Sequence, residues 1–233
     1  MKKGFLLEIS VDSVAAAVAA ERGGADRIEL CTETRVGGLT PSRALMAETR
    51  SRVKIPIFAM IRPRAGDFVY SADEFRAMHA ATREVRELEM NGMVLGILTK
   101  ERQVDVLRSR GLISACEGMP VTFHRAIDET ADFGKAVEDI IATGAERILT
   151  SGGKSTAIEG AEVIKNAIGA AGERMVILPG AGINPDNVQE VAQRTGAKEF
   201  HSGLSSVLGH GADVKRFEDE VRRLNARLMD AFD

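Results

Sequence analysis

The feature that most constrains the fold is a regular alternation between short apolar runs and longer amphipathic segments. Each pair occupies about 25 to 30 residues, as expected of a strand and the helix that follows it. We expect strands at 5–9, 27–31, 57–61, 93–98, 121–124, 147–150, 175–178 and 199–201. The best-bounded helices are expected at 71 to about 91, 132–143, 155–171, 184–195 and 213 to about 229.

Cap signals support these helices. Asp12 and Ser13 can cap the first helix, and Thr40 with Pro41 forms an N-cap and N1 pair for the second. Ser71 and Glu74 have the spacing of a capping box.

Eight strand–helix pairs without a hairpin signal indicate a parallel α/β fold, because parallel strands need crossover connections. A chain of 233 residues fits one domain, so we predict a single (β/α)8 TIM barrel over residues 1–233. A doubly wound open sheet is the alternative. For dinucleotides it would carry a G-x-G-x-x-G turn after the first strand, and this sequence has none.

Composition and charge narrow the function classes. A net charge of -3 provides no basic field for nucleic acid or anionic lipid. No apolar run approaches the ~18 residues of a membrane span, and the N-terminus lacks a secretory apolar segment. We therefore expect a cytoplasmic protein with its two cysteines reduced, and neither nucleic acid nor membrane as a partner.

Polar residues gather where the predicted strands end, which is where barrel enzymes build their active sites. The acid–base candidates are Glu8, Glu29, His124 and Asp128. We expect Glu8 and Glu29 to face a set of arginines that would hold anionic groups, namely Arg62, Arg64 and Arg125. The alternatives are that each carboxylate pairs structurally and that His124 is a satisfied core histidine.

Glycine-rich segments follow the last three strands and could place backbone N–H groups around a phosphate or carboxylate. The anion-binding candidates in these segments are Ser151, Gly152, Gly180, Gly182, His201 and Ser202. The alternative is that the glycines only form tight turns. Lys154 lies too far outside its strand for a Schiff-base role, and His79 and His210 are expected at the surface.

Eight segments in order resemble the CutC family, whose members are usually named copper homeostasis proteins. They are LLEISVDS, GGADRIELC, GGLTPS, MIRPRAGDFVYS, VTFHRAID, RILTSGGK, PGAGI and EFHSG. The resemblance covers residues 5 to about 205 and implies a (β/α)8 barrel, a cytoplasmic location and a homo-oligomer. It also implies a role in copper homeostasis, with Cu(I) bound through cysteine.

On this resemblance the metal ligand is Cys31, in the family's ELC motif. Many members also carry cysteine where this chain has Ser10 and Val69, so Cys31 lacks an obvious thiolate partner. Met60 is expected to face the helix layer rather than the lumen, and Cys116 to pack at the opposite end of the barrel.

Two main hypotheses remain. The first is a copper-handling protein that binds a copper ion at Cys31, with no other cofactor. The second is an enzyme that acts by acid–base chemistry on a small anionic or phosphorylated metabolite at the C-terminal rim. A metal-independent regulatory barrel is a third hypothesis, which no residue in the sequence supports directly.

Overall fold

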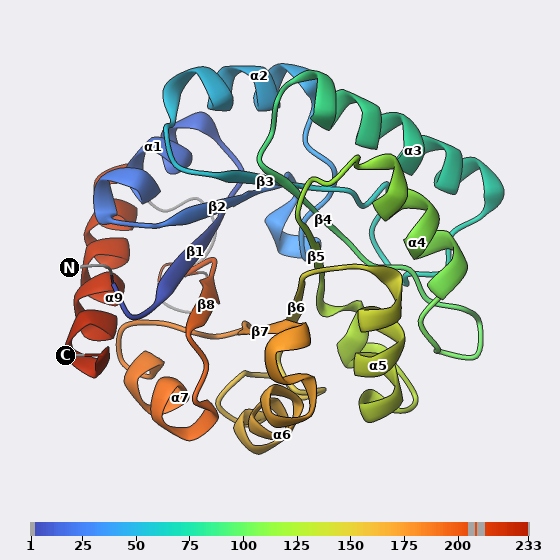
Figure 1. Cartoon of the computed structure of the whole chain (residues 1–233). Coiled ribbons are helices and arrows are strands. Elements are labelled where there is room, and N and C mark those ends of the chain that lie inside the picture. The colour runs from blue at the N-terminus through green and yellow to red at the C-terminus, as the bar shows by residue number, and fades with distance from the viewer. Residues whose placement is uncertain (1–2, 205–207, 209–212, 233) are drawn as a thin grey trace.

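The chain folds into a barrel of eight parallel strands surrounded by helices (Figure 1). The computed structural model describes residues 3–204, 208 and 213–232. The strands are β1 Leu6–Val11, β2 Arg27–Leu30, β3 Ile57–Met60, β4 Gly92–Leu95, β5 Val121–Phe123, β6 Arg147–Thr150, β7 Val176–Pro179 and β8 Glu199–Ser202. They pair in the order β7-β6-β5-β4-β3-β2-β1-β8, and β7 contacts β8. The predicted barrel is confirmed.

The surrounding helices are α1 Val14–Gly23, α2 Arg43–Arg52, α3 Ala72–Glu87, α4 Val106–Ala115, α5 Phe133–Thr143, α6 Ala161–Ala171, α7 Val188–Thr195 and α9 Val214–Phe232. Ser13 caps α1, and Ser71 with Glu74 forms the predicted capping box of α3. The prediction for α2 was wrong. Its N-cap is Ser42, because the Thr40 hydroxyl instead accepts a hydrogen bond from Arg62 N at 2.8 Å.

Strand register decides which side chains enter the lumen. Glu8 lies opposite both Arg27 and His201, Ser10 lies opposite Glu29, and Glu29 lies opposite Phe58. Because paired residues in a parallel sheet point to the same face, these side chains all point inward.

Met60 also faces the lumen, contrary to the prediction. It lies two residues after Phe58 and therefore shares its face of β3. Inside the barrel it forms a small apolar cluster, separate from the core between strands and helices, with Cys31, Phe58 and Val94.

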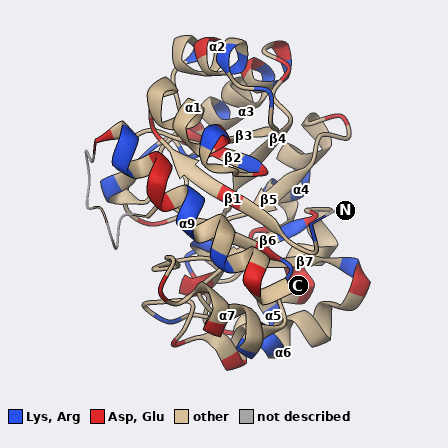
Figure 2. Cartoon of the chain, turned by 90° about the vertical axis from the view of Figure 1, so that its left-hand side faces the viewer, with Lys and Arg blue, Asp and Glu red and all other residues tan. Residues whose placement is uncertain are grey.

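Helix α9 closes the barrel against α1. An added Cβ at Gly23 would lie 2.6 Å from Val221 Cβ, so glycine allows this close approach. Phe232 stacks on Phe5 with ring centroids 5.5 Å apart, which brings the two ends of the described chain together. The outer face of α9 carries both signs of charge in ion pairs between neighbouring turns (Figure 2).

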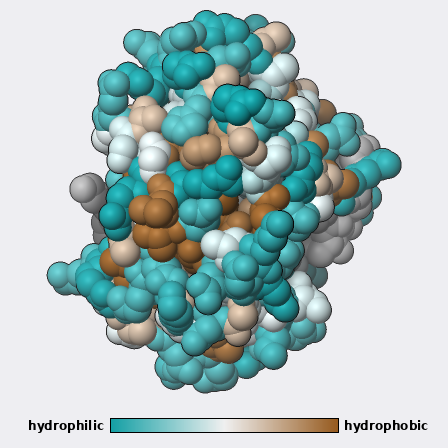
Figure 3. Space-filling view, turned by 90° about the vertical axis from the view of Figure 1, so that its right-hand side faces the viewer, coloured by the Kyte–Doolittle hydropathy of each residue, from teal (hydrophilic) through white to brown (hydrophobic). Residues whose placement is uncertain are grey.

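Figure 3 shows the side of the molecule that lies at the right in Figure 1. Its surface is mainly hydrophilic, and hydrophobic side chains are gathered in a limited area. No helix in the described part of the chain combines the length and hydropathy that a bilayer span needs.

Candidate functional site

A network of buried and half-buried ion pairs lies at the end of the lumen where the strands begin. Arg27 donates to Glu8 through Nε and to Glu199 at 2.8 Å, and Arg147 reaches Glu199 at 3.3 Å. Both guanidinium groups also lie over the Phe58 ring. Glu8 is therefore paired with arginine from the beginning of β2, not with the strand-end arginines that we expected.

Glu8 connects this network to two further functional candidates, His201 and Glu29, which lie closer to the C-terminal ends of the strands. His201 Nδ1 lies 2.7 Å from Glu8 Oε1, and His201 Nε2 lies 3.9 Å from Glu29 Oε1. Burial would raise the pKa of Glu8, but the Arg27 charge and the His201 hydrogen bond hold it at about 2.

Glu29 and His201 differ from Glu8 in their protonation. Burial raises the pKa of Glu29. Burial would lower the pKa of His201, but the charges of Glu29 and Glu8 and the Glu8 hydrogen bond raise it. Glu29 and His201 therefore hold a proton more firmly than either group would in water.

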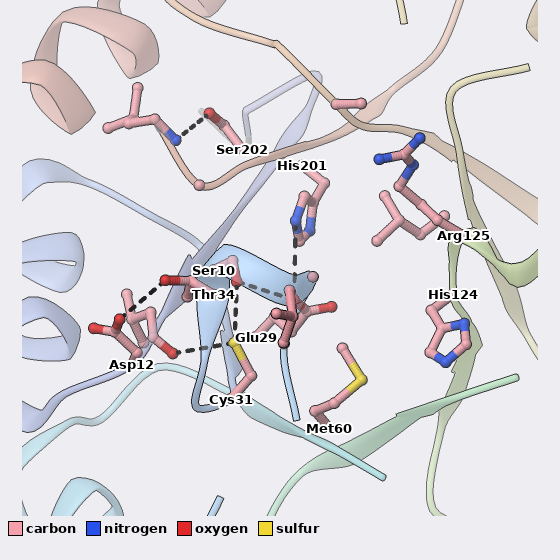
Figure 4. A pocket seen from close by; sticks show the side chains of 18 of the residues that line it. Ser10, Asp12, Glu29, Cys31, Thr34, Met60, His124, Arg125, His201 and Ser202 are labelled. Carbon is pink, nitrogen blue, oxygen red and sulfur yellow. Dashed lines mark hydrogen bonds and ion pairs between the residues drawn. The ribbon is translucent and has the colours of Figure 1, made fainter. Parts of the chain in front are cut away.

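Above these residues the lumen opens into a cavity of about 520 Å³. Strands β1 and β2 provide Ser10, Glu29 and Cys31, whereas the opposite wall includes His124 and Arg125 (Figure 4). The cavity is also lined by Met60, Arg62, Asp128, Gly182, His201 and Ser202. Apart from Ser10 and Met60, all of these residues were predicted from the sequence as site candidates, and the cavity brings them together.

One corner of the cavity contains the Cys31 thiol, beside Gly38. Cys31 is 1% exposed, its Sγ lies 3.6 Å from Ser10 Oγ, and burial together with the Glu29 charge raises its pKa to about 12. A Cβ added at Gly38 would lie 3.1 Å from Cys31 Sγ and 3.4 Å from Met60 Cε. The Cys31 thiol and the terminal methyl group of Met60 therefore both pack against this glycine.

His124 lies against Phe68, with ring centroids 4.9 Å apart. Its Nδ1 accepts a hydrogen bond from Ala126 N at 3.2 Å, so the neutral ring carries its proton on Nε2. Burial and the nearby Arg62 charge lower the pKa of His124 to about 3. His124 is therefore a neutral imidazole at physiological pH.

The glycine loop after β6 differs from the open anion cradle that we predicted. The Asp128 carboxylate accepts hydrogen bonds from Ser151 N at 3.0 Å, Gly153 N at 3.0 Å and the Thr150 hydroxyl at 2.5 Å. Gly152 N donates to Thr150 Oγ1. The loop's N–H groups are thus used by a carboxylate of the chain itself, and Asp128 organises the loop.

The three predicted arginines take different positions. Arg125 lies on the cavity wall with 45% of its side chain exposed and pairs with Asp128 at 2.9 Å. Arg62 is 5% exposed and donates to the carbonyls of Val36, Gly38 and Gly66. Arg64 lies outside the cavity lining, in ion pairs with Asp67 and Glu74.

Residues at the β7–β8 seam are mainly structural. Ser202 Oγ donates to Ile183 O at 2.6 Å, which ties the end of β8 to the loop after β7. Gly180 packs against Leu149 and His201, and a side chain there would overlap Leu149 Cδ1. Gly182 lines the cavity with φ of +71°, a conformation that favours glycine.

Arg27, Arg147 and Glu199 were not predicted as site residues, because each lies at the start of its strand rather than at the end. The signal was present at Arg27, which stands two positions before Glu29 and so shares its face. Cys116 is buried at the C-terminus of α4 and donates to Leu112 O at 3.1 Å. His79 packs edge-on against Phe75, and His210 lies outside the described residues.

Comparison with known proteins decides the family. The CutC family model matches residues 5–206. The chain belongs to the CutC family. A CutC family protein of Xylella fastidiosa (strain Temecula1) is 48% identical over 202 residues, which cover 87% of this chain and 76% of that relative. A human relative named copper homeostasis protein cutC homolog is 45% identical over 208 residues, covering 89% of this chain and 76% of the relative.

Solved structures agree with the barrel. A crystal structure of a CutC protein from Streptococcus agalactiae has a TM-score of 0.81 at 33% identity and covers 85% of this chain and 98% of that one. Thiamine phosphate pyrophosphorylase from Pyrococcus furiosus has a TM-score of 0.66 at 14% identity, covering 99% and 98%, which shows a shared fold alone.

Proposed function

We propose that this chain takes part in copper homeostasis and that it binds Cu(I) in the barrel lumen at Cys31 and Met60. Membership of the CutC family and the names of its relatives support the copper role. The observation that carries the site is that Cys31 and Met60 belong to one cluster inside the barrel, with Cys31 Sγ and Met60 Cε both against Gly38. Thiolate and thioether sulfur are soft ligands of the kind that Cu(I) prefers.

The surroundings of Cys31 determine how such a site would behave. With a pKa of about 12, Cys31 is a neutral thiol at pH 7, so copper must displace its proton. Cu(I) affinity is therefore expected to rise with pH. Ser10, which lies 3.6 Å from Cys31 Sγ, stands where many relatives have a second thiol, so this site has one thiolate instead of two.

The test is competition between the protein and a Cu(I) chelator under strictly reducing conditions. We expect C31S and M60L to weaken Cu(I) binding at least ~10-fold, because each removes one sulfur ligand. C116S removes the other buried cysteine and is the matched control, expected to bind as wild type does. Equal affinity of wild type and C31S would refute the site.

A second candidate function is acid–base catalysis on a small anionic metabolite. The cavity of about 520 Å³ is far larger than a metal ion and falls within the ~300–1,000 Å³ range of small-molecule sites. On its walls, Arg125 can hold an anionic group while Glu29 and His201 can move a proton.

A thermal-shift screen of phosphorylated and carboxylated metabolites tests this second function. The expected hit raises the melting temperature of wild type and has a smaller effect on R125M. A screen in which no compound exceeds the shift caused by free phosphate would count against it.

A further inference from the structure

Glu29 is a buried carboxylate without a full set of partners. The residue is 4% exposed. Its Oε1 accepts a hydrogen bond from Ser10 Oγ at 3.0 Å, but its Oε2 is buried without a hydrogen-bond partner among the described residues. In Figure 4 the Glu29 side chain lies at the cavity wall, beside Ser10 and below His201.

Glu29 also has no arginine or lysine partner among the described residues. Within the described chain, the only ion-pair contact of its carboxylate is with His201 Nε2 at 3.9 Å. The neighbouring charges balance one another, because Glu8 and Glu199 are both paired with arginines, Arg27 and Arg147. In the metal-free chain the proton held by Glu29 and His201 offsets the Glu29 charge, and a bound cation can take the place of that proton.

His201 is oriented toward the same point. Glu8 receives Arg27 at Oε2 and contacts His201 Nδ1 at 2.7 Å through Oε1, which fixes the imidazole ring. This leaves Nε2, on the Glu29 side, as the nitrogen free for a ligand. A carboxylate that holds the far nitrogen of a histidine is the usual outer partner of a histidine metal ligand.

We propose that the Glu29 carboxylate and His201 Nε2 bind a divalent transition-metal ion, with Zn²⁺ the best match to these oxygen and nitrogen donors. His201 Nε2 lies 3.9 Å from Glu29 Oε1, a separation that one ion bound to both atoms can span, and ligand atoms of Glu8, Glu29 and His201 all lie within 4.8 Å of one another. Glu8 positions His201, and both proposed ligands line the cavity, through which an ion could enter. This site lies beside the Cys31–Met60 pair and goes beyond the proposed Cu(I) binding, since it requires neither sulfur atom.

The experiment is Zn²⁺ binding to metal-free protein, measured by equilibrium dialysis with elemental analysis. Wild type is expected to bind one equivalent. E29Q keeps the shape of the side chain and removes the charge, whereas H201N keeps an amide for Glu8 and removes Nε2. Both should weaken Zn²⁺ binding at least ~10-fold, because each removes one of the two protein ligands. C31S, the matched lumen variant, should bind Zn²⁺ as wild type does.

A second measurement separates this site from the sulfur pair. Co²⁺ bound in place of Zn²⁺ should give visible ligand-field bands without a sulfur-to-cobalt charge-transfer band. Thermal unfolding of the metal-free variants shows whether each is folded, and either ligand variant alone suffices for the test. Absence of Zn²⁺ binding to wild type, wild-type affinity in a folded E29Q or H201N, or a sulfur-to-cobalt band that C31S removes would overturn the proposal. Loss of Cu(I) binding in C31S has no bearing on it.

Discussion

Acid sensitivity is predicted to depend on His124. Its imidazole is 4% exposed, and both burial and the charge of Arg62, followed by that of Arg125, disfavour its protonated form. The pKa of His124 falls from its ordinary 6.5 to about 3 in the folded chain. Since the unfolded chain takes up this proton first, His124 contributes stability that is present above pH 6.5 and is lost as the pH falls toward 3.

The size of this effect can be worked out at pH 5. That pH lies about 1.5 units below the unfolded pKa and well above the folded one, and one unit corresponds to about 1.4 kcal/mol. Moving from pH 8 to pH 5 should therefore cost about 2 kcal/mol of unfolding free energy through His124 alone.

Urea unfolding at pH 8 and at pH 5 measures this loss in wild type and in H124N. Asparagine can retain the acceptor for Ala126 N, and the cavity left by the ring lowers stability equally at both pH values. The loss in wild type should exceed that in H124N by about 2 kcal/mol. H79N, in α3, is the matched control for removing an imidazole elsewhere. Equal losses in wild type and H124N would refute the reasoning.

Three further substitutions test the packing and chemistry of the lumen. S10C places a second thiol beside Cys31 and should tighten Cu(I) binding at least ~10-fold in chelator competition, whereas unchanged affinity would contradict the proposed copper site. E8Q removes a buried charge shared by Arg27 and His201 and should lower the unfolding free energy by about 3 kcal/mol in urea at pH 7; an unchanged midpoint would be inconsistent with the ion-pair network. G180A forces a methyl group against Leu149 and should cost about 1 to 3 kcal/mol, which a melting temperature equal to wild type would exclude.

The barrel could be predicted because each of its units carries a local signal. Apolar strands, capping residues and helix-ending glycines repeat along the sequence, and a parallel sheet follows from the crossovers between them. Glu8 and Glu29 could be predicted as site residues because a carboxylate inside an apolar strand needs a partner.

The partners of these residues depended on register, which the sequence leaves open. Glu8 meets Arg27 because those residues pair across β1 and β2, and Met60 enters the lumen because Phe58 lies opposite Glu29. The role of Asp128 was hidden for a different reason. Its carboxylate accepts hydrogen bonds from a loop more than twenty residues later in the chain, and no local sequence pattern predicts such a contact.

The central claim is that Cu(I) is bound by sulfur inside the barrel, and X-ray absorption at the copper edge of the Cu(I)-loaded protein tests it most directly. Wild type should show two sulfur neighbours, from Cys31 and Met60, and M60L should show one. A copper ion surrounded only by nitrogen and oxygen in wild type would contradict the claim.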